Sequence, residues 1–166
     1  GRHGNASKYL DLVSKLRDAV PGISIRSTFM VGFPGEKEKH FQELITFLQK
    51  ARLDKVGCFA YSHEEGTKAF FLKDSVSEKE KARRMDELMS LQLEISDEKM
   101  ASYIGTELDV LVEEKLDENS YIGRTKYDAP EVDGVFYLTS RENVVNKIVL
   151  ARVTDSVEYD LFGEIL

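Results

Sequence analysis

Ile25-Arg26-Ser27-Thr28-Phe29-Met30-Val31-Gly32-Phe33-Pro34-Gly35-Glu36 is the stretch of sequence that decides the fold of the first half of this chain. A β-rich apolar run ends abruptly in Gly-Phe-Pro-Gly-Glu, and a helical pattern begins at once. Parallel α/β proteins place ligand-binding loops at strand ends of this kind. Gly32 and Gly35 have no Cβ, so they can turn the backbone tightly and expose its N–H groups. The stretch is either a ligand site or an ordinary strand-to-helix turn.

The flanking sequence continues the α/β pattern. Apolar residues at helical spacing predict helices over about 7–20 and 36–52, and β-type runs predict strands over 23–31 and 55–61. Glu36 is then expected just inside the second helix, where a carboxylate suits the positive end of the dipole. The short links and the helical crossover imply a parallel strand pair. Two strands cannot close a barrel, so we expect open sheet edges at which chains could pair.

The pattern of the sequence changes from helical to β-type near residue 105. Ser77 and Glu80 have capping-box spacing, and they predict a loop before residue 77 and a long helix to about residue 102. Short β-type runs follow at 108–112, 121–124, 135–138, 148–153 and 161–165. Such runs predict a five-stranded antiparallel barrel like the OB fold. The expected fold class is therefore α/β plus β, with an α/β domain over 1–102 and a β-barrel domain over 103–166.

Composition restricts the class of protein. The 166 residues are 42% hydrophobic and 32% charged, which is ordinary for a soluble globular chain. No apolar run approaches the roughly 18 residues of a membrane span, and no signal-peptide pattern is visible, so a cytoplasmic protein is expected. The single cysteine, Cys58, rules out an internal disulfide framework and is expected to be buried. His3, His40 and His63 lack ligand spacing, so we expect no metal site.

Four stretches in order resemble the radical S-adenosylmethionine (SAM) methylthiotransferases. They are the turn at 32–36, the strand and loop at 59–67, the helix at 88–96, and a C-terminal region resembling a TRAM domain at 121–134. The resemblance is greatest to the RimO-type branch, which is similar to enzymes that methylthiolate an aspartate of small-subunit ribosomal protein twelve. It implies that the two strands end a six-stranded partial TIM-type barrel.

The resemblance also implies a set of SAM-binding residues at the two strand ends. Arg26 could pair with the carboxylate of SAM or of the substrate aspartate, or it could form a structural ion pair at the solvated start of its strand. Phe59 and Tyr61 could bracket the adenine, or they could pack in a barrel core. The implied cofactor-binding residues are Arg26, Gly32, Phe33, Pro34, Gly35, Glu36, Phe59 and Tyr61.

The cysteine count limits what the chain can do alone. Enzymes of this family hold an iron–sulfur cluster by Cys-x3-Cys-x2-Cys and carry three further cysteines in an N-terminal domain, and this chain has only one cysteine. It therefore looks like the C-terminal part of a longer enzyme that uses SAM and two [4Fe-4S] clusters. By itself it is expected to hold no cofactor and to be inactive, and the sequence identifies no catalytic residue.

Charge separates the two halves of the chain. Residues 1–99 carry 17 Lys and Arg against 16 Asp and Glu, a net of +1, whereas residues 100–166 carry 6 against 14, a net of −8. An acidic barrel suits a basic protein, here a ribosomal protein, better than RNA phosphates, although six scattered basic residues could still gather on one face. Two alternatives stay open: part of a tRNA adenosine methylthiotransferase, or a non-catalytic OB-like binding module.

Overall fold

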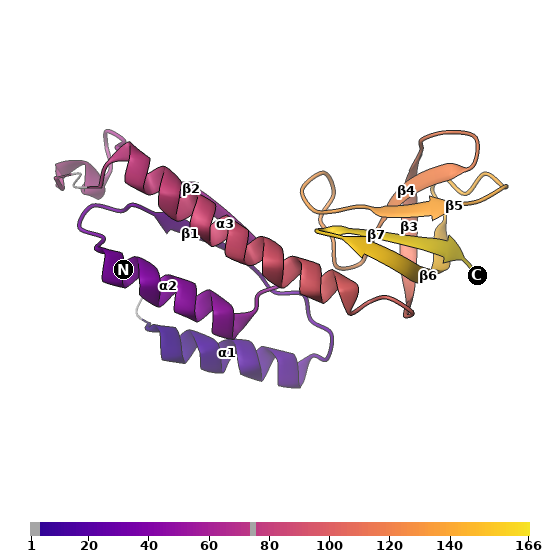
Figure 1. Cartoon of the computed structure of the whole chain (residues 1–166), viewed down its shortest axis with the longest axis horizontal. Coiled ribbons are helices and arrows are strands. Elements are labelled where there is room, and N and C mark those ends of the chain that lie inside the picture. Colours follow the sequence, from indigo (N-terminus) through magenta and orange to yellow (C-terminus); the bar gives the residue numbers. More distant parts are fainter. Residues whose placement is uncertain (1–3, 74–75) are drawn as a thin grey trace. The chain divides into compact units, whose positions relative to one another are not determined.

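The computed structural model describes residues 4–73 and 76–166, and the chain divides into two compact units. The first unit ends at Ile95 and the second spans Ser96–Leu166 (Figure 1). The division between the units falls inside a long helix, several residues before the domain boundary at 102/103 that the sequence predicts. That domain boundary stays a prediction. The expected loop over 62–76 contains a short 3-10 turn at Lys68–Phe71, and its residues 74–75, like His3, lie outside the described residues.

The first unit alternates helices and strands. Its elements are α1 (Ala6–Ala19), β1 (Arg26–Val31), α2 (Glu38–Ala51), β2 (Lys55–Ala60), η1 (Lys68–Phe71) and α3 (Glu78–Ala101), the last of which runs on past the unit boundary. β1 and β2 pair in parallel, from Arg26 opposite Lys55 to Val31 opposite Ala60. The predicted α/β order and the parallel pair are therefore confirmed.

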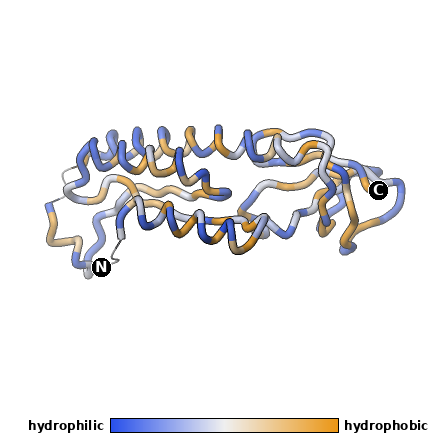
Figure 2. The backbone as a smooth tube through the Cα atoms, turned by 90° about the horizontal axis from the view of Figure 1, so that it is seen from below, coloured by the Kyte–Doolittle hydropathy of each residue, from blue (hydrophilic) through white to orange (hydrophobic). Residues whose placement is uncertain are grey.

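The helices cover one face of the two-stranded sheet. Hydrophobic and hydrophilic residues alternate along them (Figure 2), as amphipathic helices require. Val31 of β1 is buried together with Phe41 and Leu48 of α2 and Leu88 of α3. Full burial of each such side chain contributes about 1.5–3 kcal/mol. No helix within residues 4–73 and 76–166 is both long and apolar enough to cross a membrane.

The opposite face of the sheet exposes side chains from both strands. Alternate residues of β1, namely Arg26, Thr28 and Met30, are exposed there. The register places Phe59 of β2, also exposed, beside Met30. An apolar pair such as this on an open sheet face can contact a ligand or a further part of a protein.

The second unit is a closed five-stranded barrel. Its strands are β3 (Glu107–Lys115), β4 (Ser120–Thr125), β5 (Phe136–Thr139), β6 (Ile148–Val157) and β7 (Asp160–Ile165), in the order β3-β4-β5-β7-β6. The sequence predicted a wholly antiparallel barrel, but β5 and β7 are parallel. A closed ring with an odd number of strands cannot alternate direction throughout, so one parallel pair is required. The barrel is mixed, and its OB-like character is confirmed.

The barrel is filled by alternate residues of each strand. Val110, Tyr121, Phe136 and Ala151 are almost completely buried and form its core with their neighbours. Gly163 is needed at one close approach of the strands, because a Cβ there would collide with the main-chain oxygen of Arg152.

Candidate functional site

The turn at the carboxyl end of β1 is tightly defined. The Glu36 N–H donates to the Phe33 carbonyl at 2.8 Å, which closes a β-turn over residues 33–36. Pro34 occupies its second position and Gly35, at φ +85°, its third, which is the signature of a type II turn. A Cβ on Gly35 would meet nothing within 4 Å, so this glycine is required by backbone conformation and faces open space.

Gly32 is required for two reasons. Its φ is +77°, and a Cβ there would clash with the stem of Lys81, including Cδ at 3.0 Å. Its N–H was expected to be exposed for a ligand, but it donates to Glu36 Oε1 at 3.1 Å. Glu36 was expected inside the following helix, but α2 begins at Glu38. The Glu36 carboxylate thus closes the turn on itself and does not cap the helix.

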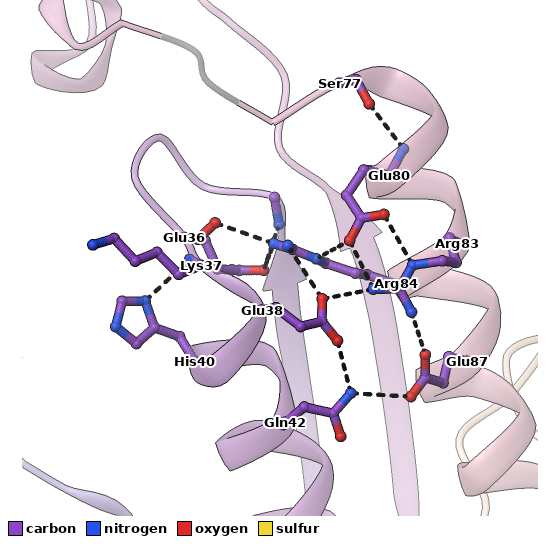
Figure 3. Close-up of polar contacts among 11 residues, drawn as sticks. Glu36, Lys37, Glu38, His40, Gln42, Ser77, Glu80, Arg83, Arg84 and Glu87 are labelled. Atoms are coloured by element: carbon purple, nitrogen blue, oxygen red, sulfur yellow. Dashed lines mark hydrogen bonds and ion pairs between the residues drawn. The ribbon is translucent and has the colours of Figure 1, made fainter.

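A buried arginine holds Glu36 from the other side (Figure 3). Arg84 of α3, whose side chain is 5% exposed, donates from Nη1 to Glu36 Oε1 at 2.8 Å and to the Glu36 carbonyl at 3.3 Å. Its Nε donates to Glu80 at 2.9 Å, and Glu38 lies 3.6 Å from its Nη2. Arg84 thus binds both the carboxylate and the main-chain carbonyl of Glu36, and hydrogen bonds between charged groups of this kind are stronger than neutral ones. Arg84 therefore ties α3 to the turn.

The neighbouring Arg83 makes a separate, more exposed set of contacts. It donates to Glu80 and to Glu87 within α3, and across to Glu38 of α2 at 2.7 Å. Chiefly because of the Arg83 hydrogen bond, and then because of Arg84, the pKa of Glu80 is lowered from 4.5 to about 2. The predicted cap is present, since the Glu80 N–H donates to Ser77 Oγ at 3.3 Å, while the Glu80 carboxylate serves the two arginines.

Aromatic rings gather where the two strands end. Phe33 is 41% exposed and meets the buried ring of Tyr61 edge-on, with centroids 5.3 Å apart. The Tyr61 N–H donates to the Val31 carbonyl at 2.9 Å, which joins the two strand ends. Lys81 Nζ lies 5.3 Å from the centre of the Tyr61 ring. An exposed aromatic edge backed by a buried ring is a surface on which a flat ring can stack.

The structure brings most of the predicted site residues together. Gly32 to Glu36 form the turn, and Tyr61 packs beside it through Phe33. Phe59 lies on the open face of the sheet and is exposed. Arg26 lies at the opposite end of β1 from the turn, about 20 Å from Gly32 along the strand at roughly 3.3 Å per residue. It is exposed at the start of the strand, which is where its alternative, structural interpretation put it.

Sequence reasoning missed Lys81 and Arg84. Both are buried, with 1% and 4% of their surface exposed, although both are charged residues of a helix. One signal was present: these two residues share a helical stripe with Leu88, Gln92 and Ile95, all buried. Charged residues on such a stripe require ionic or hydrogen-bonding partners.

Cys58 of β2 was expected to be buried but is only half-buried, and it packs against the core on the helix side of the sheet. Burial, and then the charge of Glu36, raises the pKa of its thiol to about 11. A thiol of this kind is a poor nucleophile and metal ligand at neutral pH. Among the described residues, no group of three or more His, Cys, Asp and Glu side chains is placed to hold a metal ion.

The barrel carries its basic residues beside acidic ones. Arg124 pairs with Glu113 and Arg152 pairs with Glu107, each at 2.8 Å. These pairs join neighbouring strands on the outer surface. Two of the six basic residues of this half are therefore already balanced by carboxylates, which leaves less positive charge for phosphates.

Comparison with known proteins agrees with both units. The model of the TRAM domain family matches residues 104–166. The chain is 47% identical over 98% of its length to the ribosomal protein uS12 methylthiotransferase RimO of Francisella tularensis subsp. novicida. It is 43% identical over 98% to the protein of that name from a Thermoanaerobacter species and 46% identical over 98% to that from Salmonella arizonae. The chain spans only 37–38% of the length of these curated relatives.

Proposed function

Because the chain belongs to the RimO-type methylthiotransferase family, we propose that it is part of an enzyme that methylthiolates an aspartate of ribosomal protein uS12. The observation that carries the proposal is the identity of 43–47% over nearly the whole chain to proteins bearing that name. The enzyme would work in the bacterial cytoplasm, where ribosomal proteins are made.

We propose that the first unit supplies one wall of the SAM site. The turn at 32–36 lies where βα proteins bind ligands, beyond the carboxyl ends of parallel strands. Its outer side is open at Gly35, and Phe33 and Phe59 expose aromatic surface nearby. These features fit the adenosyl and methionine parts of SAM. Arg26 is further from the turn, and its proposed role is to pair with the carboxylate of the substrate aspartate or of SAM.

Iron–sulfur ligands would have to come from outside this chain. Cluster ligation in this family needs three cysteine thiolates, and the only cysteine here is half-buried with a raised pKa. SAM and the two [4Fe-4S] clusters would supply the radical chemistry when they are bound to the longer protein. This chain's own residues would orient SAM and exclude water from one side of it. We therefore expect the 166-residue chain alone to be inactive and free of iron.

The TRAM barrel would recognise the protein substrate. Residues 100–166 carry 6 basic against 14 acidic residues, a net of −8, and two of the arginines are paired with carboxylates. Complementary fields favour a basic ribosomal protein over nucleic acid. Titration of the 166-residue chain with uS12 and with tRNA tests this. Salt should weaken the uS12 contact, since the Debye length falls from about 8 Å at 0.15 M to about 3 Å at 1 M.

The central experiment is substrate choice by the parent protein. The protein is purified anaerobically, its clusters are reconstituted, and it is incubated with SAM and either uS12 or tRNA, followed by mass spectrometry. We expect one methylthio group on an aspartate of uS12. Modification of a tRNA adenosine would instead place the chain in the tRNA-modifying branch. Modification of neither, by a protein with a full complement of iron, would leave the binding-module alternative.

A further inference from the structure

We infer that Arg84 is a positioning residue of the SAM site: it orients the Gly32–Glu36 turn through the Glu36 carboxylate without touching SAM. This inference rests on the proposed function, because it assigns the turn to SAM.

The Glu36 carboxylate, together with the peptide backbone, sets the shape of the turn. Oε1 of Glu36 accepts both the Gly32 N–H at 3.1 Å and Arg84 Nη1 at 2.8 Å. Gly32 and Gly35 both have positive φ, so the backbone there has the freedom of glycine. The Glu36 carboxylate adds a side-chain contact to the main-chain hydrogen bond of the turn, and so favours the observed conformation over others that glycine allows.

Arg84 restricts the position of the Glu36 carboxylate. Glu36 is 15% exposed and Arg84 is 5% exposed, so water competes weakly for either group. The guanidinium is itself held by Glu80 at 2.9 Å, and its Cζ lies 5.6 Å from the centre of the Phe41 ring. The planar fork of arginine can serve these partners at once, which a lysine ammonium cannot reproduce.

Arg84 lies on the side of the turn away from the proposed SAM surface. The Arg84 guanidinium is buried between α3 and the turn, whereas the open side of the turn is the side of Gly35 and Phe33. Loss of Arg84 should therefore release the turn and weaken SAM binding, while leaving every direct contact with SAM in place. Turnover lost for this reason should recover at high SAM concentration.

Arg83 offers a matched control in the next position of the same helix. It donates to Glu80, Glu87 and Glu38, a set of carboxylates as strongly charged as that around Arg84, and none of these acceptors belongs to the turn at 32–36. Arg84→Met and Arg83→Met each remove one positive charge from α3. A general effect of charge or helix stability should appear in both variants, and a positioning effect only in Arg84→Met.

Two measurements test the inference. In the 166-residue chain, amide exchange of Gly32 should be about tenfold faster in Arg84→Met than in wild type or Arg83→Met, because the acceptor of its hydrogen bond is released. In the parent protein, equilibrium dialysis should show a SAM dissociation constant raised about tenfold in Arg84→Met and less than about twofold in Arg83→Met, with Arg84→Lys between them. Turnover at saturating SAM should stay within about twofold of wild type.

The outcomes separate the two claims. A wild-type parent protein that does not bind SAM overturns the proposed function. Amide exchange of Gly32 then still tests whether Arg84 fixes the conformation of the turn. A wild type that binds SAM, with Arg84→Met binding equally well, overturns the positioning role. If Arg84→Met does not fold, Glu36→Gln decides. It keeps an oxygen for the Gly32 N–H but loses the ion pair, so an unchanged SAM affinity in that variant overturns the inference.

Discussion

Replacing Gly32 by alanine should destabilise the first unit by more than the same change at Gly35. Both residues have similar positive φ, +77° and +85°, so both variants carry a conformational cost of about 1–2 kcal/mol. The entropy that alanine removes from the unfolded chain is the same at both positions and cancels in the comparison. What differs is space: a Cβ at Gly32 meets Lys81, and one at Gly35 meets nothing within 4 Å.

The Lys81 stem cannot easily move away from a new Cβ. It is 1% exposed, and its ammonium is held by Glu78 at 2.8 Å. Overpacking of this kind costs about 1–3 kcal/mol. Gly32→Ala should therefore lower the free energy of unfolding by about 2–5 kcal/mol, against about 1–2 kcal/mol for Gly35→Ala. Urea unfolding of the 166-residue chain, followed by far-ultraviolet circular dichroism, measures both values.

A double-mutant cycle identifies the clash as the cause. Lys81→Ala removes the atoms that a Cβ on Gly32 would meet most closely, so it should recover about 1–3 kcal/mol in the Gly32→Ala background. Lys81→Ala combined with Gly35→Ala should be additive within about 0.5 kcal/mol. Equal losses for the two glycine variants, or additivity in both cycles, would refute the reasoning.

Three further predictions concern acid stability, thiol reactivity and barrel closure. The folded-state pKa of Glu80 is lowered from 4.5 to about 2, chiefly by Arg83. The stability that the Glu80 carboxylate contributes is therefore present above pH 4.5 and lost as the pH falls toward 2. The difference in urea midpoint between wild type and Glu80→Gln should vanish over that pH range. The rate of alkylation of Cys58 by iodoacetamide in the folded chain should titrate with a midpoint near pH 11. Glu36→Gln should lower that midpoint because it removes a negative charge that disfavours the thiolate, although burial, the larger cause, remains. An unchanged midpoint would contradict the role assigned to the Glu36 charge. Gly163→Ala should abolish amide protection throughout the barrel while the first unit keeps its own, because the new Cβ collides with a main-chain oxygen; protection retained in the barrel would show that the strands can separate at that point.

Element types could be predicted from the sequence because each has a strong local signal. The apolar periodicity of α2 and the β-type apolar run that ends β1 are visible without any structure, and the predicted elements occur in the predicted order. Boundaries were less accurate where a turn adjoins a helix. α2 begins at Glu38 and not at Glu36, because residues 33–36 form the type II turn and Lys37 is an extended N-cap.

The partners of the turn could not be predicted from the sequence. The Gly-Phe-Pro-Gly-Glu stretch predicted a sharp turn at a strand end, and the type II geometry at Pro34 and Gly35 follows from those residue types. Arg84 lies 48 residues beyond Glu36 in the chain, and its place on the apolar stripe of α3 indicates burial, whereas the place of Arg83 does not. The sequence does not indicate what the buried guanidinium contacts, because only the packing of α3 against the turn brings it to Glu36.

The measurement that tests the account most directly is hydrogen exchange of the parent protein with and without SAM. If the turn is part of the SAM site, peptides that contain residues 32–36 should exchange more slowly when SAM is present, and peptides from β6 of the TRAM barrel should not change. Protection elsewhere in the parent protein, with exchange at residues 32–36 unaffected by saturating SAM, would contradict the account.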